Sequence, residues 1–260
     1  MNPDTPDALL ARVRKLLVKA EADGVTPAEA QALTAKAAEL MAKYGIDRAL
    51  LAAVRPETDR PGDRIIDIAN PWARVQAHLL CGLAAALRCQ CVILPRSAGP
   101  APALRAHPRS GPGSRIHVFG FASDIERTDV LYTSLLLQMW QGLSAAEPPA
   151  WSRSPRAWRR SWLLGFATAV VARVRAAEQR AAQRAADAPA GSGPSAALVL
   201  ADRTEIIERT LRQAYPVTRT ARVTYSGTGY GTGYAQGQRA DIGPSRLGRP
   251  SGRALTRGQR

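Results

Sequence analysis

Two apolar stripes at helical spacing constrain the first 45 residues more than any other feature constrains the chain. They lie within residues 7–22 and 28–44, where apolar side chains recur every three or four positions. Residues 26–29 (Thr-Pro-Ala-Glu) form a capping box that starts the second stripe, and Gly45 predicts its end. Two helices joined by so short a turn must pack antiparallel. We therefore predict a helical hairpin, followed by a short helix over 47–54.

The next segment predicts a small mixed domain. A long loop rich in Pro and Gly, at 96–114, separates the second of its strands from the third. Ser123 and Glu126 repeat the capping-box pattern at the start of its second helix. This order predicts an α+β sandwich. The expected elements are strand, helix, strand, strand and helix, at residues 64–69, 72–88, 89–94, 115–121 and 123–143.

The remaining residues predict one long helix over 157–186, whose second half alternates Ala with polar residues and should project into solvent. Asp202 and Glu205 are expected cap partners of a later helix at 202–214, and short strands are expected at 196–200 and 218–225. The overall expectation is an α+β fold. Its predicted parts are a helical hairpin at 1–55, a small α+β domain at 62–143, a basic helix with a Gly-rich α/β segment at 157–243, and a disordered basic tail at 244–260.

Positive charge is concentrated in the last part of the chain. The net charge is +15, of which residues 1–55 and 56–150 contribute +1 each and residues 151–260 contribute +13. Such asymmetry indicates a polyanion or an acidic surface as partner. A genome bias towards Arg codons explains why only four Lys occur, but it does not explain why Asp and Glu thin out after residue 150.

Cysteine usage and hydropathy predict a soluble cytoplasmic protein. Three cysteines cannot form a disulfide framework, and so sparse and odd a count is typical of a reducing compartment. The longest apolar run, Trp162–Ala172, is too short for a bilayer, which needs about 20 residues. The first residues show no signal-peptide pattern. We therefore expect no membrane association.

The N-terminal hairpin resembles a known family. Its pattern comprises a basic-Leu-Leu start, an acidic residue near the turn, Glu-Ala and Lys-Ala pairs, and a terminal Leu-Met-x-x-Tyr-Gly, here Leu40 to Gly45. These motifs resemble domain of unknown function family 2786, which occurs in bacteria and phages. One departure is Asp23-Gly24-Val25, where many relatives carry an Asn-Pro or similar turn. The resemblance implies an uncharacterised bacterial or phage-type protein, and it carries no catalytic residues to transfer.

One constellation of residues could in principle hold a metal ion. It has the spacing H-x2-C-x7-C-x-C, which differs from the C-x2-C pairs of structural zinc sites. Cysteines at such positions are commonly small core residues, so we predict neither a metal nor a cofactor. Motifs of nucleophilic or metalloprotease catalysis do not occur in the sequence, so no catalytic residue is assigned. The four residues of the constellation are His78, Cys81, Cys89 and Cys91.

The candidate binding residues are arginines and tyrosines of the basic part. Guanidinium groups contact phosphates, and tyrosines stack on bases. The alternative for the arginines is a solvated helix face. For the segment Gly227–Gly237 the alternatives are a glycine-rich strand or turn whose tyrosines pack on the domain, nucleic-acid binding, or a small anionic ligand. The full set is Arg153, Arg156, Arg159, Arg160, Arg173, Arg180, Arg184, Arg219, Arg222, Tyr230, Tyr234 and Arg239.

From the sequence we expect a non-enzymatic protein that binds the phosphate backbone of DNA or RNA without base specificity. The alternative is a protein-interaction or phage accessory module, whose hairpin docks a protein partner and whose charge is incidental.

Overall fold

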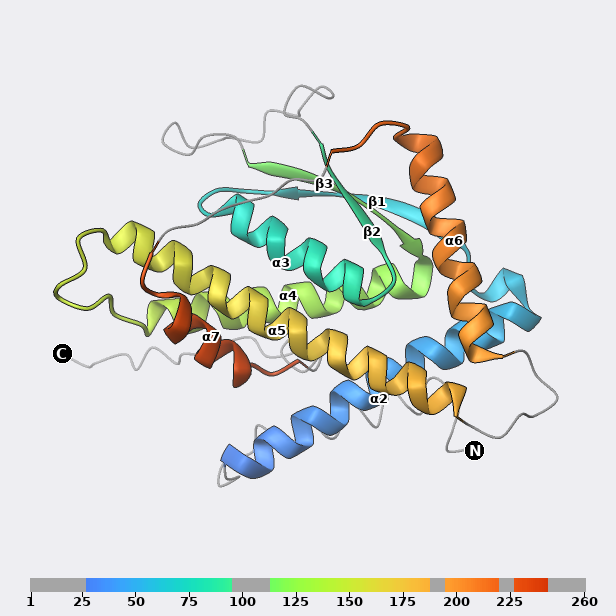
Figure 1. Ribbon diagram of the computed structural model, residues 1–260, viewed down its shortest axis with the longest axis horizontal. Helices are drawn as coiled ribbons and strands as arrows, with labels where there is room; N and C mark the ends of the chain where they lie inside the picture. Colours follow the sequence, from blue (N-terminus) through green and yellow to red (C-terminus); the bar gives the residue numbers. More distant parts are fainter. Residues whose placement is uncertain (1–26, 95–112, 188–194, 220–226, 243–260) are drawn as a thin grey trace, which may run out of the picture.

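The computed structural model describes residues 27–94, 113–187, 195–219 and 227–242. In this part of the chain, most of the helices lie on one side of a small sheet (Figure 1). The first predicted helix of the hairpin, most of the predicted strand at 218–225 and the predicted tail lie outside these residues. The elements are α2 (Pro27–Val54), the 3-10 turn η1 (Pro56–Thr58), β1 (Pro61–Ile68), α3 (Ala73–Ala86), β2 (Gln90–Leu94), β3 (Ser114–Phe121), α4 (Ala122–Ser144), α5 (Pro155–Ala186), α6 (Ala196–Ala214) and α7 (Tyr230–Gln238).

The sheet is antiparallel, with strand order β1-β3-β2. Successive side chains of a strand point to opposite faces, so β3 contributes to both sides of the sheet. Ile116 and Val118 enter the main core with α3, α4 and α5, whereas Phe119 and Phe121 pack against Ile207 of α6. The predicted mixed α/β character and the order strand-helix-strand-strand-helix are confirmed.

Helix α5 is the central element of the packing. It contacts α3, α4 and α7 along its first half and α2 and α6 along its second half. The expectation that the second half projects into solvent is wrong, because Ala177, Glu178 and Ala181 are all buried. The alanines present a flat surface, which lets α2 and α6 approach closely.

Helix α2 continues through Gly45 to Val54, so the predicted end at Gly45 and the separate helix at 47–54 are wrong. A β-carbon at position 45 would overlap Nη1 of Arg127 and lie 2.6 Å from Cζ of Arg127. The glycine is therefore needed for close approach of a buried side chain. Its backbone does not adopt the left-handed conformation that favours glycine at a helix end.

The predicted capping box of α4 is also wrong. The helix begins at Ala122, which places Ser123 inside its first turn. A carboxylate from the segment before β1 accepts a hydrogen bond from a backbone N–H group at this helix end. Asp59 accepts hydrogen bonds from the backbone N–H of Ser123 at 3.0 Å and from its hydroxyl at 2.6 Å. Glu126 is solvent-exposed. A distant carboxylate thus replaces the local cap.

Two segments expected to be non-helical form helices. Residues 196–200 begin α6, because Ala196 and Val199 share one buried face with Ile207, at helical rather than strand spacing. Asp202 and Glu205 therefore lie within the helix and not at its cap. The glycine-rich segment forms α7, which lies along α5.

Candidate functional site

Four sequence-predicted arginines gather where α5 begins. We call Arg153, Arg156, Arg159 and Arg160 the basic end of α5. The first three are exposed and Arg160 is half-buried. Ser154 caps the helix by accepting a hydrogen bond from the backbone N–H of Ala157 at 3.2 Å. Within the residues that the structure describes, the first turn of α5 holds no acidic side chain.

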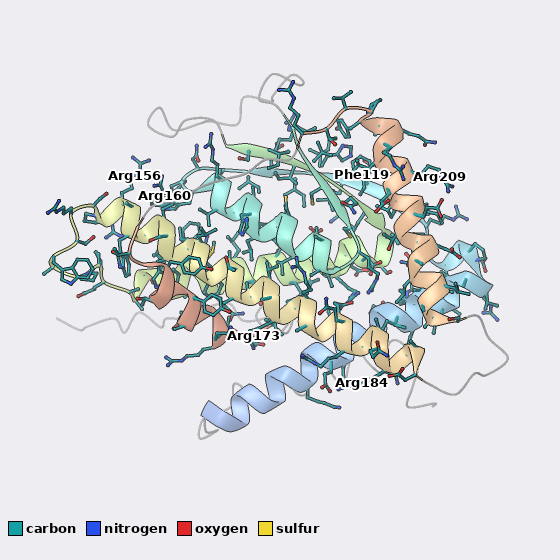
Figure 2. All side chains as sticks on the ribbon, in the orientation of Figure 1. Phe119, Arg156, Arg160, Arg173, Arg184 and Arg209 are labelled. Atoms are coloured by element: carbon teal, nitrogen blue, oxygen red, sulfur yellow. The ribbon has the colours of Figure 1, made fainter. Side chains whose placement is uncertain are left out.

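Aromatic side chains accompany these arginines. The guanidinium carbon of Arg156 lies 5.8 Å from the ring centre of Trp72, within the range of a cation–π contact. Trp151, just before the helix, is 70% exposed. Figure 2 shows Arg156 and Arg160 together at this end of α5 and Arg184 at the far end.

Helix α7 runs parallel to α5 and in direct contact with it. Gly229 lies against Trp158, Gly233 against Trp162 and Gly237 against Phe166. Both series advance by four residues, so the glycines form one stripe that meets one stripe of α5. The parallel order brings the N-termini of both helices to the same end of the molecule (Figure 1).

The two predicted tyrosines of α7 stack on each other. The ring centres of Tyr230 and Tyr234 are 6.1 Å apart, with 25° between their planes. Tyr230 is 40% exposed and occupies the first position of α7. Among the described residues, no side chain caps this helix. Exposed aromatic area and uncapped backbone N–H groups therefore lie near the basic end of α5.

Arg173, another predicted binding residue, serves the fold. Its Nη1 donates to the carbonyl oxygens of Gly237 at 3.0 Å and Ala240 at 2.5 Å, where α7 ends. Burial lowers the pKa of its guanidinium, and Asp241 counteracts part of that shift. Its donors satisfy carbonyls at a helix C-terminus and complement the helix dipole there.

The structure does not bring the other predicted residues to the basic end of α5. Arg180 and Arg184 lie about 30–40 Å further along α5, at 1.5 Å per residue. Arg184 also contacts Glu39 at 3.2 Å. Arg219, after α6, and Arg239, at the end of α7, are exposed, and Arg222 lies outside the described residues.

Sequence reasoning missed a charge network buried between the helices. Arg88 donates to Glu178 at 2.9 Å and to Asp124 at 3.3 Å. Arg127 pairs with the same two carboxylates, at 3.1 Å for Asp124. Burial disfavours the charge on Arg127, but the two carboxylates outweigh it and raise the pKa of its guanidinium.

A third arginine extends this network to α6. Arg203 donates to Asp59 at 2.8 Å and to Asp124 at 3.1 Å, and its guanidinium lies 3.6 Å from the ring centre of Phe121. Three guanidinium groups thus balance three carboxylates. One feature of the sequence pointed to the network. Glu178 is the only acidic residue of α5 and lies in an alanine-rich stretch. We call Asp59, Arg88, Asp124, Arg127, Glu178 and Arg203 the buried charge network.

A second polar arrangement lies on the sheet face that α6 covers. His117 of β3 contacts the Tyr215 hydroxyl through Nδ1 at 2.8 Å and Oδ2 of Asp63 through Nε2 at 2.8 Å. Asp63 is exposed, and the other two residues are half-buried. No sequence motif links them, because they are 54 and 98 residues apart in the chain.

The cysteines behave as core residues. Burial raises the pKa of Cys89 to about 12. The neighbouring thiol of Cys91 lowers the pKa of Cys81, whereas Cys81 and burial raise the pKa of Cys91. In the described ranges, no group of three or more His, Cys, Asp or Glu side chains is placed to hold a metal ion.

Among the described residues, no helix is both long enough and apolar enough to span a membrane. Comparison with curated proteins and with solved structures found no match. The N-terminal segment does match a family model, which covers most of the predicted hairpin and follows α2 as far as Arg48. Residues 8–48 match the model of the family described as Protein of unknown function (DUF2786), which is the family that the hairpin motifs resemble.

Proposed function

We propose that this protein binds the phosphate backbone of nucleic acid, without reading base sequence, through the basic end of α5. One observation carries the proposal: Arg153, Arg156 and Arg159 are exposed within seven residues, and none has a carboxylate partner among the described residues. They stand at the positive end of a helix dipole, which disfavours cations there. An anion bound at this end would relieve that repulsion.

The chemistry of these side chains suits phosphate. Guanidinium groups form paired hydrogen bonds with phosphate oxygens, and they remain charged at any physiological pH. Exposed rings at the same end, Trp151 and Tyr230, offer surfaces on which unpaired bases stack. Contacts of both kinds tolerate any sequence, because phosphates and ring faces are common to all nucleotides.

The test is a salt titration with the full-length protein and a fluorescent oligonucleotide. The variant Arg153→Gln/Arg156→Gln/Arg159→Gln removes three charges from the basic end. The matched control, Arg175→Gln/Arg180→Gln/Arg184→Gln, removes the same net charge from the far end of the same helix. For duplex DNA, three phosphate contacts contribute a slope of about −2.7 in log K against log salt, or about 40-fold in affinity between 50 and 200 mM.

The first variant should lose that part of the slope equally for all sequences, and the control should retain it. Equal losses in both variants would show that binding follows net charge alone and would overturn the proposal. Lack of binding by the wild-type protein at 50 mM salt, or a loss that depends on base sequence, would also overturn it.

A further inference from the structure

The hydrogen-bond chain Asp63–His117–Tyr215 has a defined direction. The carboxylate of Asp63 only accepts hydrogen bonds when ionised, so the proton between the two residues is on Nε2 of His117. In a neutral imidazole, Nδ1 is then an acceptor, and the hydroxyl of Tyr215 donates to it at 2.8 Å. The chain is thus arranged to move a proton from the phenol to the imidazole.

This arrangement meets the geometric criterion for an activated nucleophile. A nucleophile and its base lie within about 2.6–3.2 Å, and a third group orients the base. Tyr215 follows the last residue of α6, and its ring packs edge-on against His117 and Phe119. Asp63 is exposed, and His117 and Tyr215 are half-buried, so the three side chains lie at or near the surface.

We propose that Tyr215 attacks phosphodiesters, with His117 as its general base and Asp63 as a positioning residue. The choice of phosphodiester rests on the proposed function, because the charge of +15 concentrates polyanions around the protein.

The step is a transesterification. The Tyr215 oxygen forms a bond to phosphorus, and the phenolic proton passes to Nδ1 of His117. The bond from phosphorus to the leaving oxygen breaks, and that oxygen receives the proton from the imidazolium, directly or through water. The products are a tyrosine phosphodiester and a free alcohol. Atoms and charge balance without an oxidant, a reductant or another co-reactant.

The test uses a small probe, bis(p-nitrophenyl) phosphate, with the full-length protein. We expect release of up to one equivalent of p-nitrophenolate per chain and a matching mass increase. Peptide mapping should place the adduct on Tyr215 and on none of the other five tyrosines. Tyr215→Phe keeps the ring but removes the nucleophile, so the adduct should disappear. His117→Gln should slow its formation by about 100-fold or more.

The substitution Asp63→Asn tests whether Asp63 positions His117 for the reaction or only supports the fold. It should slow the reaction and change its pH profile, since the imidazole loses its carboxylate partner. Glu205→Gln, an exposed carboxylate of α6 outside this chain of hydrogen bonds, should leave the rate unchanged.

Three results would overturn the proposal: no adduct on the wild-type protein, an adduct that persists in Tyr215→Phe, or a wild-type rate in His117→Gln. An adduct formed only with p-nitrophenyl acetate would exclude phosphodiesters as the substrate class. The probe contains no nucleic acid, so these outcomes are independent of the salt titration, and either proposal can fail alone.

Discussion

The contact between α5 and α7 predicts opposite effects for two neighbouring glycine substitutions. A β-carbon at Gly233 would lie 2.6 Å from the carbonyl carbon of Trp162 and 2.8 Å from its Cα. Both atoms belong to the backbone of α5 and cannot rotate away. A β-carbon at Gly231 would meet nothing within 4 Å. The two glycines are two residues apart in the same helix, so each serves as the control for the other.

The magnitude follows from these distances. The β-carbon would also overlap the carbonyl oxygen of Trp162, and ordinary contact begins near 3.4 Å, so Gly233→Ala must push α7 away from α5 by at least about 1 Å. A gap of that size forfeits up to about half of the dispersion energy at the contact. Overpacking of this kind costs about 1–3 kcal/mol, and alanine regains about 1 kcal/mol through helix propensity. We expect Gly233→Ala to destabilise by up to about 2 kcal/mol and Gly231→Ala to stabilise by about 0.5–1 kcal/mol.

The assay combines urea unfolding with hydrogen exchange, because α7 can detach before the rest of the protein unfolds. Gly233→Ala should increase exchange of the α7 amides and of any α5 amides that α7 shields, whereas Gly231→Ala should reduce exchange in α7. Effects of the same sign and size in both variants would refute the argument, since helix propensity alone would then explain the data.

Three further substitutions test the buried parts of the fold. Gly45→Ala should destabilise by about 2–4 kcal/mol in urea unfolding, because its β-carbon displaces Arg127 from the buried charge network. Gly62→Ala, where the space is open, is the control, and equal effects would contradict this role of Gly45. Glu178→Gln should cost about 3–5 kcal/mol, since two buried guanidinium groups lose their shared carboxylate; a cost below about 0.5 kcal/mol, the usual range for surface changes, would show that the network relaxes without it. Burial raises the pKa of Cys89 from 9.0 to about 12, so the folded state holds this proton more tightly and stability should fall as the pH rises from 9 to 12. Cys89→Ala should flatten that fall in thermal-unfolding midpoints, and an unchanged slope would contradict the assignment.

Local periodicity predicted most of the elements. The apolar spacing at 72–88, 123–143 and 157–186 indicated α3, α4 and α5, and the β-branched residues at 89–94 indicated β2. These predictions succeed because a buried helix or strand face repeats in the sequence with the period of the backbone. The sequence motif of the hairpin was likewise sufficient for the family resemblance.

Local signals failed where a distant residue supplied the deciding contact. Ser123 resembled a helix cap, but Asp59 from another segment takes that role. Gly45 resembled a helix end, but it makes room for Arg127. The glycines of α7 have low helix propensity, and their helix exists because α5 packs closely against it.

The candidate sites show the same division between features set by local sequence and features set by distant contacts. The sequence by itself determined where positive charge concentrates and which arginines at the start of α5 could be exposed. Only the tertiary structure decided that Arg173 caps α7, that the buried charge network draws on α4, α5 and α6, and that Asp63, His117 and Tyr215 meet. The reason is physical: charge and periodicity are properties of neighbouring residues, whereas hydrogen-bond partners 50 to 100 residues apart become neighbours only when the chain folds.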